Sequence, residues 1–420
     1  VYLSGVWAAS LDRFARMAEA VGERALADSA RSVRAKAVRT MESRLWLPER
    51  RQYAFALLEG GKVNESLTAW PATAMSFDVF DRARGAEMAA RLASSELMTD
   101  WGARPLSAAS PLFDPLHYNN GAVWPFVTGW VALAQYRYHN PLAGKFALDA
   151  IARTTFDESR GRNPEVISGR LYKPLDTSVP QQFFATSMVL TPLIRGLLGL
   201  DVDVPARRVT LAPHLPPEWD SVRVENVPVG RGRVSVTVRR TTGRVVAVVS
   251  RAGPDSTLFE LVFSPALPLG ARAAGAGVVT DVTPGDVHAT VRGTLGGGTT
   301  RLEVPFIGGW SVIPPPARPA IGDRSSAVRV LSERLAGERY TVALEGLAGR
   351  TYRVRVRAPR AVAAADLALA ADAGRASVAP ASGALVEHAI DVTFPTGGAN
   401  ADGYTAVAIA FTLRDRGAER

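Results

Sequence analysis

The chain has 420 residues, enough for two or three domains, and hydrophobic residues make up 47% of it, enough for a large core. It has no cysteine, which excludes disulfides, thiolate metal sites and cysteine nucleophiles, and no apolar run of about eighteen residues that would predict a membrane span. The net charge of +9 rests on scattered arginines, with 4 lysines among 49 basic residues, so the clustered basic stripe of a nucleic-acid-binding protein is absent.

The sequence opens on VYLSGVWAAS, with no Met, no basic segment and no signal-cleavage site. We therefore expect a fragment or a processed form of a longer product. A soluble protein is expected, but the sequence does not choose between the cytoplasm and the periplasm or the cell exterior.

Residues 1–204 are predicted to be mainly helical, because apolar residues recur at spacings of three and four. Short polar or Pro/Gly loops separate the helical segments, which favours stacked helical hairpins over alternating βα units. The predicted helices are 2–21, 24–46, 67–79, 82–96, 121–139, 142–153 and 180–199.

From Val209 onward the apolar residues alternate with a period of two, and Gly, Pro and Asp turns separate the runs, which include predicted strands at 221–229, 259–263 and 404–414. This pattern predicts an antiparallel β-sandwich over 205–313, a Pro-rich linker over 314–324 and a second β-sandwich over 325–420. A structural role for the second sandwich is favoured over carbohydrate binding.

The stretch 101–199 places aromatic and amide side chains, together with Glu165, in loops between the predicted helices. Sugars offer flat ring faces to aromatic side chains and hydroxyls to amides and carboxylates, so we expect a site for a neutral polyhydroxylated ligand. Glu165, in the loop RGRNPEVISGRLY, is the candidate general base that takes a proton from water. The alternative is a surface Glu in an ion pair.

The run HYNNGAVWPF supplies most of the predicted sugar contacts. His117, Asn119 and Asn120 can hydrogen-bond to hydroxyls, and the rings of Tyr118 and Trp124 can stack on a pyranose. The alternative is a capped helix start with buried aromatic side chains.

Three further residues are candidate substrate contacts. Trp101 and Arg104 lie in WGARPLS, where the planar guanidinium could bind vicinal hydroxyls or a carboxylate, or form a structural ion pair. Gln181 opens the helix predicted at 180–199, where it and Gln182 could reach the site or cap the helix.

Several chemistries have no motif in this sequence. It lacks a phosphate-binding loop, a dinucleotide fingerprint, a zinc-protease helix and a nucleophile elbow, so no cofactor is predicted. The five histidines are spread too widely to suggest a metal site, and a structural role is expected for His214. They are His117, His139, His214, His288 and His388.

The order of these motifs resembles the C-terminal half of amylo-α-1,6-glucosidase (glycogen-debranching-like) enzymes, relatives of glucoamylase and trehalase with a six-hairpin (α/α)6 barrel. The resemblance covers roughly residues 1–220. The matching stretches are Trp101–Ser107, Tyr118–Pro125, Pro164–Glu165, Val179–Gln181, Pro192–Leu200 and Leu211–Trp219.

The resemblance implies an inverting glycoside hydrolase for α-glucosidic or related oligosaccharides or polysaccharides, with Glu165 in the position of the general base. Asn119 stands where many relatives have His. The general acid of such enzymes lies in the first half of the barrel, which would precede Val1, and the chain carries only about half of the helices of a closed toroid. The alternatives are a non-catalytic carbohydrate-binding or scaffold protein and, among enzymes, a rhamnosidase, trehalase or sugar phosphorylase.

Overall fold

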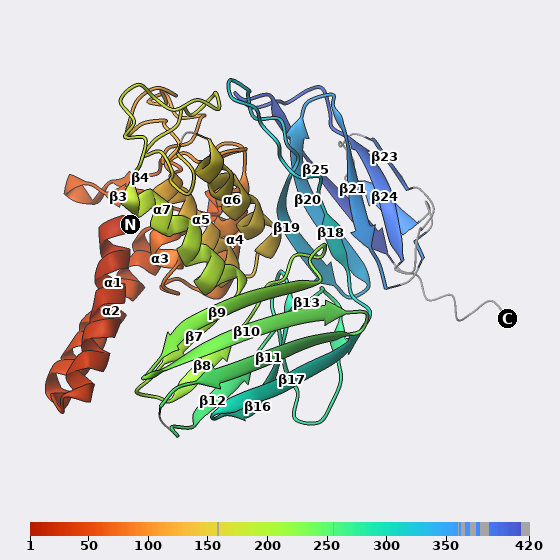
Figure 1. The fold of residues 1–420 in the computed structure, drawn as a ribbon. Coiled ribbons are helices and arrows are strands. Elements are labelled where there is room, and N and C mark those ends of the chain that lie inside the picture. The colour runs from red at the N-terminus through yellow and green to blue at the C-terminus, as the bar shows by residue number, and fades with distance from the viewer. Residues whose placement is uncertain are drawn as a thin grey trace.

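The structure, a computed structural model, describes residues 1–157, 159–254, 256–359, 361–362, 366–369, 375–378 and 386–412. A helical part comes first in the chain, and two groups of β-sheets follow it (Figure 1). The predicted order of helices before strands is therefore confirmed. No described helix combines the length and the apolar character needed to cross a membrane.

The described residues of the helical part form seven α-helices. Pro occupies the first turn of α3, α5 and α6, where its missing N–H costs nothing. The prediction over 67–79 is too long, since only five of its residues are α-helical. The predicted helix 180–199 is α-helical over α7 and continues as a π-helix over Pro192–Leu197. The helices are α1 (Tyr2–Ala20), α2 (Arg24–Arg44), α3 (Pro71–Met75), α4 (Arg82–Ala93), α5 (Pro125–Arg137), α6 (Pro141–Arg153) and α7 (Phe183–Thr191).

Short elements connect these helices. Three 3-10 turns lie at Pro48–Arg50, Glu59–Gly61 and Thr154–Phe156. Three two-residue strand pairs fold the loops back on themselves: β1 (Trp46–Leu47) with β2 (Gln52–Tyr53), β3 (Ala56–Leu57) with β4 (Val63–Asn64), and β5 (Met98–Thr99) with β6 (Gly102–Ala103).

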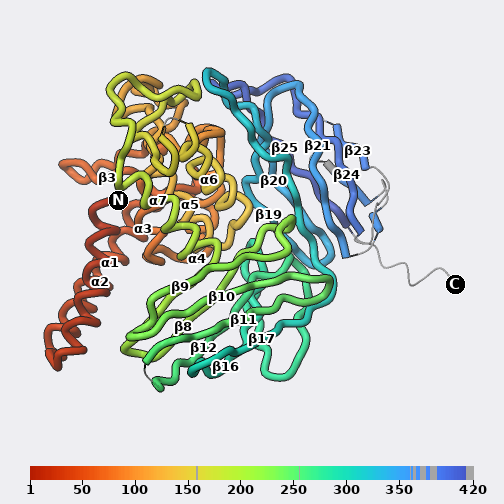
Figure 2. Tube along the Cα trace, in the orientation of Figure 1, coloured from red at the N-terminus to blue at the C-terminus, as the bar shows by residue number. Residues whose placement is uncertain are grey.

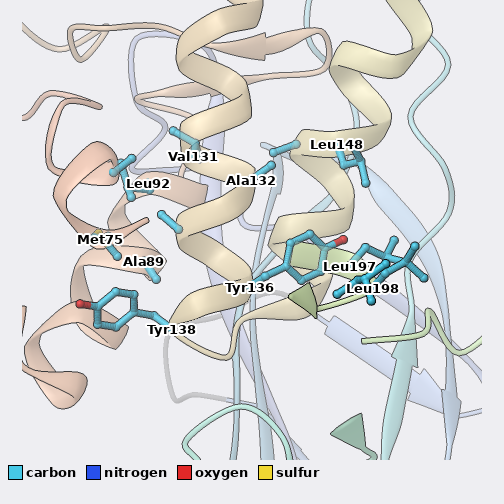
Figure 3. Close-up of a cluster of buried hydrophobic side chains, with 14 of the residues drawn as sticks. Met75, Ala89, Leu92, Val131, Ala132, Tyr136, Tyr138, Leu148, Leu197 and Leu198 are labelled. Carbon is cyan, nitrogen blue, oxygen red and sulfur yellow. The ribbon is translucent and has the colours of Figure 1, made fainter. Parts of the chain in front are cut away.

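Helix α5 is the centre of the helical part. Its apolar residues surround the whole helix, which is typical of a buried helix. Figure 3 shows Val131, Ala132 and Tyr136 of α5 between side chains of α3 and α4 on one side and of α6 and the π-helix on the other. Gly129 allows a close approach of α7, because a Cβ there would lie 2.4 Å from the Cβ of Met188.

Helices α1 and α2 form a hairpin that extends away from the rest of the helical part (Figures 1 and 2). Small residues pack the two helices together, among them Ala15, Ala18 and Ala27. Large apolar side chains of the same hairpin face solvent; they are Leu3, Trp7, Phe14, Met17, Leu26 and Val33.

The first group of sheets contains a five-stranded sheet in the order β14-β17-β11-β10-β9 and a six-stranded sheet in the order β13-β16-β12-β8-β7, with β15 beside β16. Buried residues of both sheets belong to one core. Among the described strands of this group, β8 and β12 form a parallel pair, and the other pairs are antiparallel. The strands are β7 (Leu200–Asp203), β8 (Arg208–Leu211), β9 (Ser221–Val229), β10 (Gly232–Thr241), β11 (Arg244–Ala252), β12 (Phe259–Phe263), β13 (Ala266–Leu267), β14 (Arg272–Ala273), β15 (Val279–Val282), β16 (Val287–Leu295) and β17 (Gly298–Ile307).

The second group has two four-stranded antiparallel sheets, β18-β21-β24-β23 and β19-β20-β25-β22, around a separate core. The last two residues of the strand predicted over 404–414 lie outside the described residues. The strands are β18 (Ser311–Ile313), β19 (Arg329–Ala336), β20 (Arg339–Leu347), β21 (Thr351–Arg357), β22 (Leu367–Leu369), β23 (Arg375–Val378), β24 (Glu387–Thr393) and β25 (Tyr404–Thr412).

The segment predicted as a linker lies against the helical part. The backbone N–H of Tyr172 donates to the carbonyl oxygen of Asp323 at 2.8 Å, and the N–H of Gly322 donates back to Tyr172 at 2.9 Å. Two strand pairs also cross the predicted limits at 204 and 313: β7 with β8, and β18 with β21. The domain ranges remain predictions. The structure shows that these strand pairs join residues on the two sides of each limit.

Candidate active site

Two loops of the helical part hold the central residues of the candidate site. Tyr118 lies in the loop before α5, and Glu165 lies in the loop between α6 and α7. Val123 and Ile167 connect these loops by two backbone hydrogen bonds of 2.7 and 2.9 Å. This bridge fixes the two loops relative to each other, although they are more than forty residues apart in sequence.

The side chain of Glu165 is half-buried and accepts two hydrogen bonds at the same oxygen. The Tyr118 hydroxyl donates to Oε1 at 2.6 Å, and the Gln182 amide donates to Oε1 at 3.4 Å. Among the described residues, none donates to Oε2 or forms an ion pair with Glu165, so the ion-paired alternative has no support. One carboxylate oxygen is held and the other is left for a ligand or water.

Trp124 holds Tyr118 in this position. Its indole N–H donates to the Tyr118 carbonyl oxygen at 2.9 Å, and the two rings meet edge to face with centroids 4.5 Å apart. Desolvation, followed by the hydrogen bond to Glu165, raises the pKa of Tyr118 to about 12. The phenol therefore stays protonated and remains a donor at neutral pH.

His117 has a role in the loop itself. Its Nδ1 accepts hydrogen bonds from the backbone N–H groups of Asn119 and Asn120, at 3.2 and 3.1 Å. His117 and Asn119 are exposed, and Asn120 is half-buried. Sugar contacts of these three residues remain predictions. In the structure, His117 caps the turn that contains Asn119 and Asn120.

Trp101 and Arg104 do not line the surface around Glu165, which corrects their predicted placement. The Trp101 side chain is fully buried, its N–H donates to the Ser168 carbonyl oxygen at 2.9 Å, and its ring stacks on Tyr172. Arg104 is 1% exposed and pairs with Asp402 of the second β group at 2.6 Å. Its guanidinium also donates to backbone carbonyls, so it is held inside the protein as a structural ion pair, one of the two roles weighed for it.

Gln181 and Gln182 have different positions. Gln181 is exposed and donates to the Ser159 hydroxyl at 3.0 Å, whereas the neighbouring Gln182 reaches Glu165. The N-cap of α7 is Gln182, so the helix begins at Phe183. The helix therefore starts three residues later than the predicted start at 180, and the substrate contact of Gln181 remains a prediction.

A second cluster of chemically active side chains lies away from these two loops in sequence. His139, His214, Asp286 and His288 bring one potential metal-ligating atom each, all within 4.8 Å of one another. The wide spread of the histidines along the chain was the reason for predicting no metal site, and the structure shows that this spread does not keep these three histidines apart.

Comparison with known proteins gives one family match. A model of the mannosylglycerate hydrolase MGH1-like glycoside hydrolase domain matches residues 2–161. No curated protein matches the chain.

Solved structures give weaker similarities. A sialidase is similar over 56% of this chain and 23% of its own, with 14% identity and a TM-score of 0.50. A GH63 mannosylglycerate hydrolase from Thermus thermophilus is 16% identical over 44% of this chain and 43% of its own, with a TM-score of 0.36. An alpha-L-rhamnosidase from Dictyoglumus thermophilum is 9% identical over 70% of this chain and 30% of its own, with a TM-score of 0.43.

The chain thus spans less than half the length of each of these three solved proteins. The family match covers the first helices, the Tyr118 loop and the segment up to residue 161, and it ends just before Glu165. The matched segment is thus similar to a glycoside hydrolase domain, and the match does not single out the glycogen-debranching enzymes that the motifs of this chain resemble.

Proposed function

We propose that this chain is part of a glycoside hydrolase in which Glu165 is the general base of an inverting reaction. The observation that carries the proposal is the 2.6 Å hydrogen bond from Tyr118 to Glu165, which joins the Y-N-N-G loop to the candidate base. Tyr118 and Gln182 hold Oε1, so Oε2 is the atom that would accept a proton from the attacking water.

An inverting enzyme needs a second carboxyl group, which protonates the glycosidic oxygen from the other side of the sugar. We assign that general acid to protein outside this sequence, on a half of the (α/α)6 toroid that would pack on the α1–α2 hairpin. The support is the apolar surface of the hairpin, where Leu3 is 78% exposed and Met17 is 69% exposed. Apolar side chains gathered on one surface favour a partner that covers them.

The substrate that we propose has an α-linked sugar joined either to another sugar or to a small hydroxy acid. The first class follows the resemblance of the motifs. The second follows the description of the matching family as mannosylglycerate hydrolase MGH1-like. The half-buried Trp124 offers a ring for the sugar in either case. In the same proposal, each β group is a β-sandwich that supports the catalytic part.

The experiment uses the intact gene product and a panel of α-linked oligosaccharides together with mannosylglycerate, followed by NMR immediately after mixing. We expect hydrolysis of at least one substrate, with the β-anomer of the sugar released first, since a single displacement inverts the anomeric centre. Initial release of the α-anomer would contradict the inverting mechanism. Sugar binding without any release by the folded protein would favour a non-catalytic carbohydrate-binding protein instead.

A further inference from the structure

Four buried or nearly buried side chains meet between the helical part and the first group of sheets. His139 lies between α5 and α6, His214 lies between β8 and β9, and Asp286 and His288 lie at the start of β16. The side chains of His214, Asp286 and His288 are 7%, 4% and 10% exposed. The cluster is separate from Glu165 and has no part in the proposed hydrolysis.

The backbone around two of the histidines fixes where their lone pairs point. Nδ1 of His288 lies 2.8 Å from the carbonyl oxygen of Ser264, and Nδ1 of His214 lies 3.3 Å from that of Gly196. A carbonyl oxygen can only accept, so we assign the proton to Nδ1 in both rings. In the neutral rings, Nε2 is then an unprotonated donor of an electron pair.

These electron pairs converge on one point. The two Nε2 atoms of His214 and His288 are 3.2 Å apart, and Asp286 Oδ2 lies 3.3 and 3.5 Å from them. Within the part of the chain that the structure describes, no hydrogen bond satisfies the buried Asp286 Oδ2 or the buried His139 Nδ1, and this Nδ1 lies 3.0 Å from Asp286 Oδ1. In this tautomer, Nε2 of His214, Nε2 of His288 and Oδ2 of Asp286 are all acceptors, and no proton lies between them. A bound cation would stabilise this arrangement.

The spacing fits a tetrahedral ion. Zinc bonds of about 2.0–2.1 Å hold neighbouring ligand atoms about 3.3–3.4 Å apart. The three distances among His214, Asp286 and His288 agree with this value, and His139, which brings a ring nitrogen within 4.8 Å of the other ligand atoms, is the candidate for the fourth corner. Three imidazoles and one carboxylate suit zinc and related transition ions better than calcium or magnesium.

Other features hold the four ligands in place. The Thr283 hydroxyl donates to Asp286 Oδ1 at 2.7 Å, and the Nδ1–carbonyl pairs orient the two rings as in known metal sites. Gly285 lets its loop reach His139, because a Cβ there would lie 1.7 Å from the His139 carbonyl oxygen. A groove of about 1640 Å³, lined partly by His139, His214 and His288, gives an ion a route from solvent.

We propose that His139, His214, Asp286 and His288 bind one divalent transition metal ion of the zinc class. Because the protein supplies four ligands, the ion has no open position for substrate and is structural. It ties the end of α5 to the first group of sheets, and its removal releases that connection.

The test uses the intact protein, made without a polyhistidine tag, stripped with a chelator and titrated with Zn²⁺ or Co²⁺ alone. We expect one equivalent of zinc by mass spectrometry, intense visible bands of tetrahedral Co²⁺, and a melting temperature that rises by about 5 °C or more when zinc is restored. The cobalt spectrum of the unmodified protein keeps the test decisive even where a variant fails to fold.

Two variants separate metal binding from packing. His288→Gln should weaken zinc binding by at least about 100-fold. His388→Gln, the same change at a buried histidine of the second β group, should keep one equivalent of zinc. Absence of zinc and cobalt binding by the stripped protein would overturn the proposal and identify the cluster as a protonated His–Asp group, and equal binding by His288→Gln would overturn it as well.

Discussion

The Tyr118–Glu165 pair is the contact on which the candidate site depends. A hydrogen bond to a charged group contributes about 1.5–3 kcal/mol, because it replaces water at a site that is partly desolvated. Tyr118 also orients the carboxylate, since both observed donors bind the same oxygen, Oε1. A phenol that stays protonated at neutral pH is suited to this task.

Tyr118→Phe removes the hydroxyl and keeps the ring beside Trp124. We expect kcat to fall by about 10- to 100-fold, the equivalent of one hydrogen bond to a charged group, while the melting temperature changes little. Steady-state kinetics and thermal unfolding of the two proteins measure this. An unchanged kcat would mean that Tyr118 does not position the base.

The two neighbouring glutamines form a matched pair. Gln182 contacts Glu165 and Gln181 contacts Ser159, so Gln182→Ala should reduce kcat by about 5- to 30-fold, equivalent to about 1–2 kcal/mol, and Gln181→Ala should reduce it less. Parallel kinetics of both variants decide between them. A larger loss in Gln181→Ala would restore the contact predicted from the sequence.

Some of this site could be predicted from the sequence and some could not. The loop HYNNGAVWPF and Glu165 stand out because their residue types suit sugar chemistry, and Tyr118 does contact Glu165. The positions of Trp101 and Arg104 were not predictable from their own surroundings. Arg104 is held by Asp402, almost 300 residues away, and no local pattern records that contact.

At the scale of single elements, strand positions follow directly from local alternation. The predicted runs at 221–229 and 259–263 coincide with β9 and β12, because a period of two needs only neighbouring residues. The pairing of strands does not follow from local alternation. The parallel contact of β12 with β8 joins strands about fifty residues apart, and the helix predicted over 67–79 shrinks to α3, whose start is set by Pro71.

The pair β19–β20 contains another Tyr–Glu contact, from the Tyr340 hydroxyl to Glu333. Burial, the main cause, raises the pKa of Glu333 to about 7 from its ordinary 4.5. The folded protein therefore binds this proton up to a higher pH than the unfolded chain does, so its stabilising effect is complete below pH 4.5 and is lost as the pH rises to 7.

We expect the free energy of unfolding to fall by about 1–3 kcal/mol between pH 4.5 and 7 on account of this group, and Glu333→Gln to remove that dependence. Urea unfolding of the unmodified protein and of Glu333→Gln across this pH range measures how the free energy of unfolding of each depends on pH. Glu303→Gln, at a surface Glu paired with Arg244 and Arg301, controls for the loss of one charge. Equal slopes in Glu333→Gln and the unmodified protein would contradict the expectation.

At the scale of the whole molecule, buried ionic contacts connect the helical part to the second β group. Asp100 Oδ1 accepts from Arg329 at 2.9 Å, and Oδ2 accepts from the backbone of Ser326 and Ala327 at 2.7 and 3.0 Å. Both charged side chains are 2% exposed. Arg104 and Asp402 form a second such pair, so the second β group is fixed to the helices by charges that water does not reach.

Asp100→Asn leaves the buried Arg329 without its counter-charge and should destabilise the protein by about 3–5 kcal/mol. The same change at Asp391, which pairs with Arg353 at the surface, should cost less than about 1 kcal/mol. Chemical unfolding and limited proteolysis of both variants measure the difference. Similar losses in the two variants would mean that the buried network does not hold the parts together.

The central claim is that Glu165 is the general base. The most direct measurement compares hydrolysis and sugar binding by Glu165→Gln and by the unmodified protein, both made from the intact gene product. We expect kcat to fall by about 10²- to 10⁴-fold while the Kd for substrate stays within a few-fold, because the amide keeps its shape but cannot take a proton. Turnover close to that of the unmodified protein in a folded Glu165→Gln would contradict the claim.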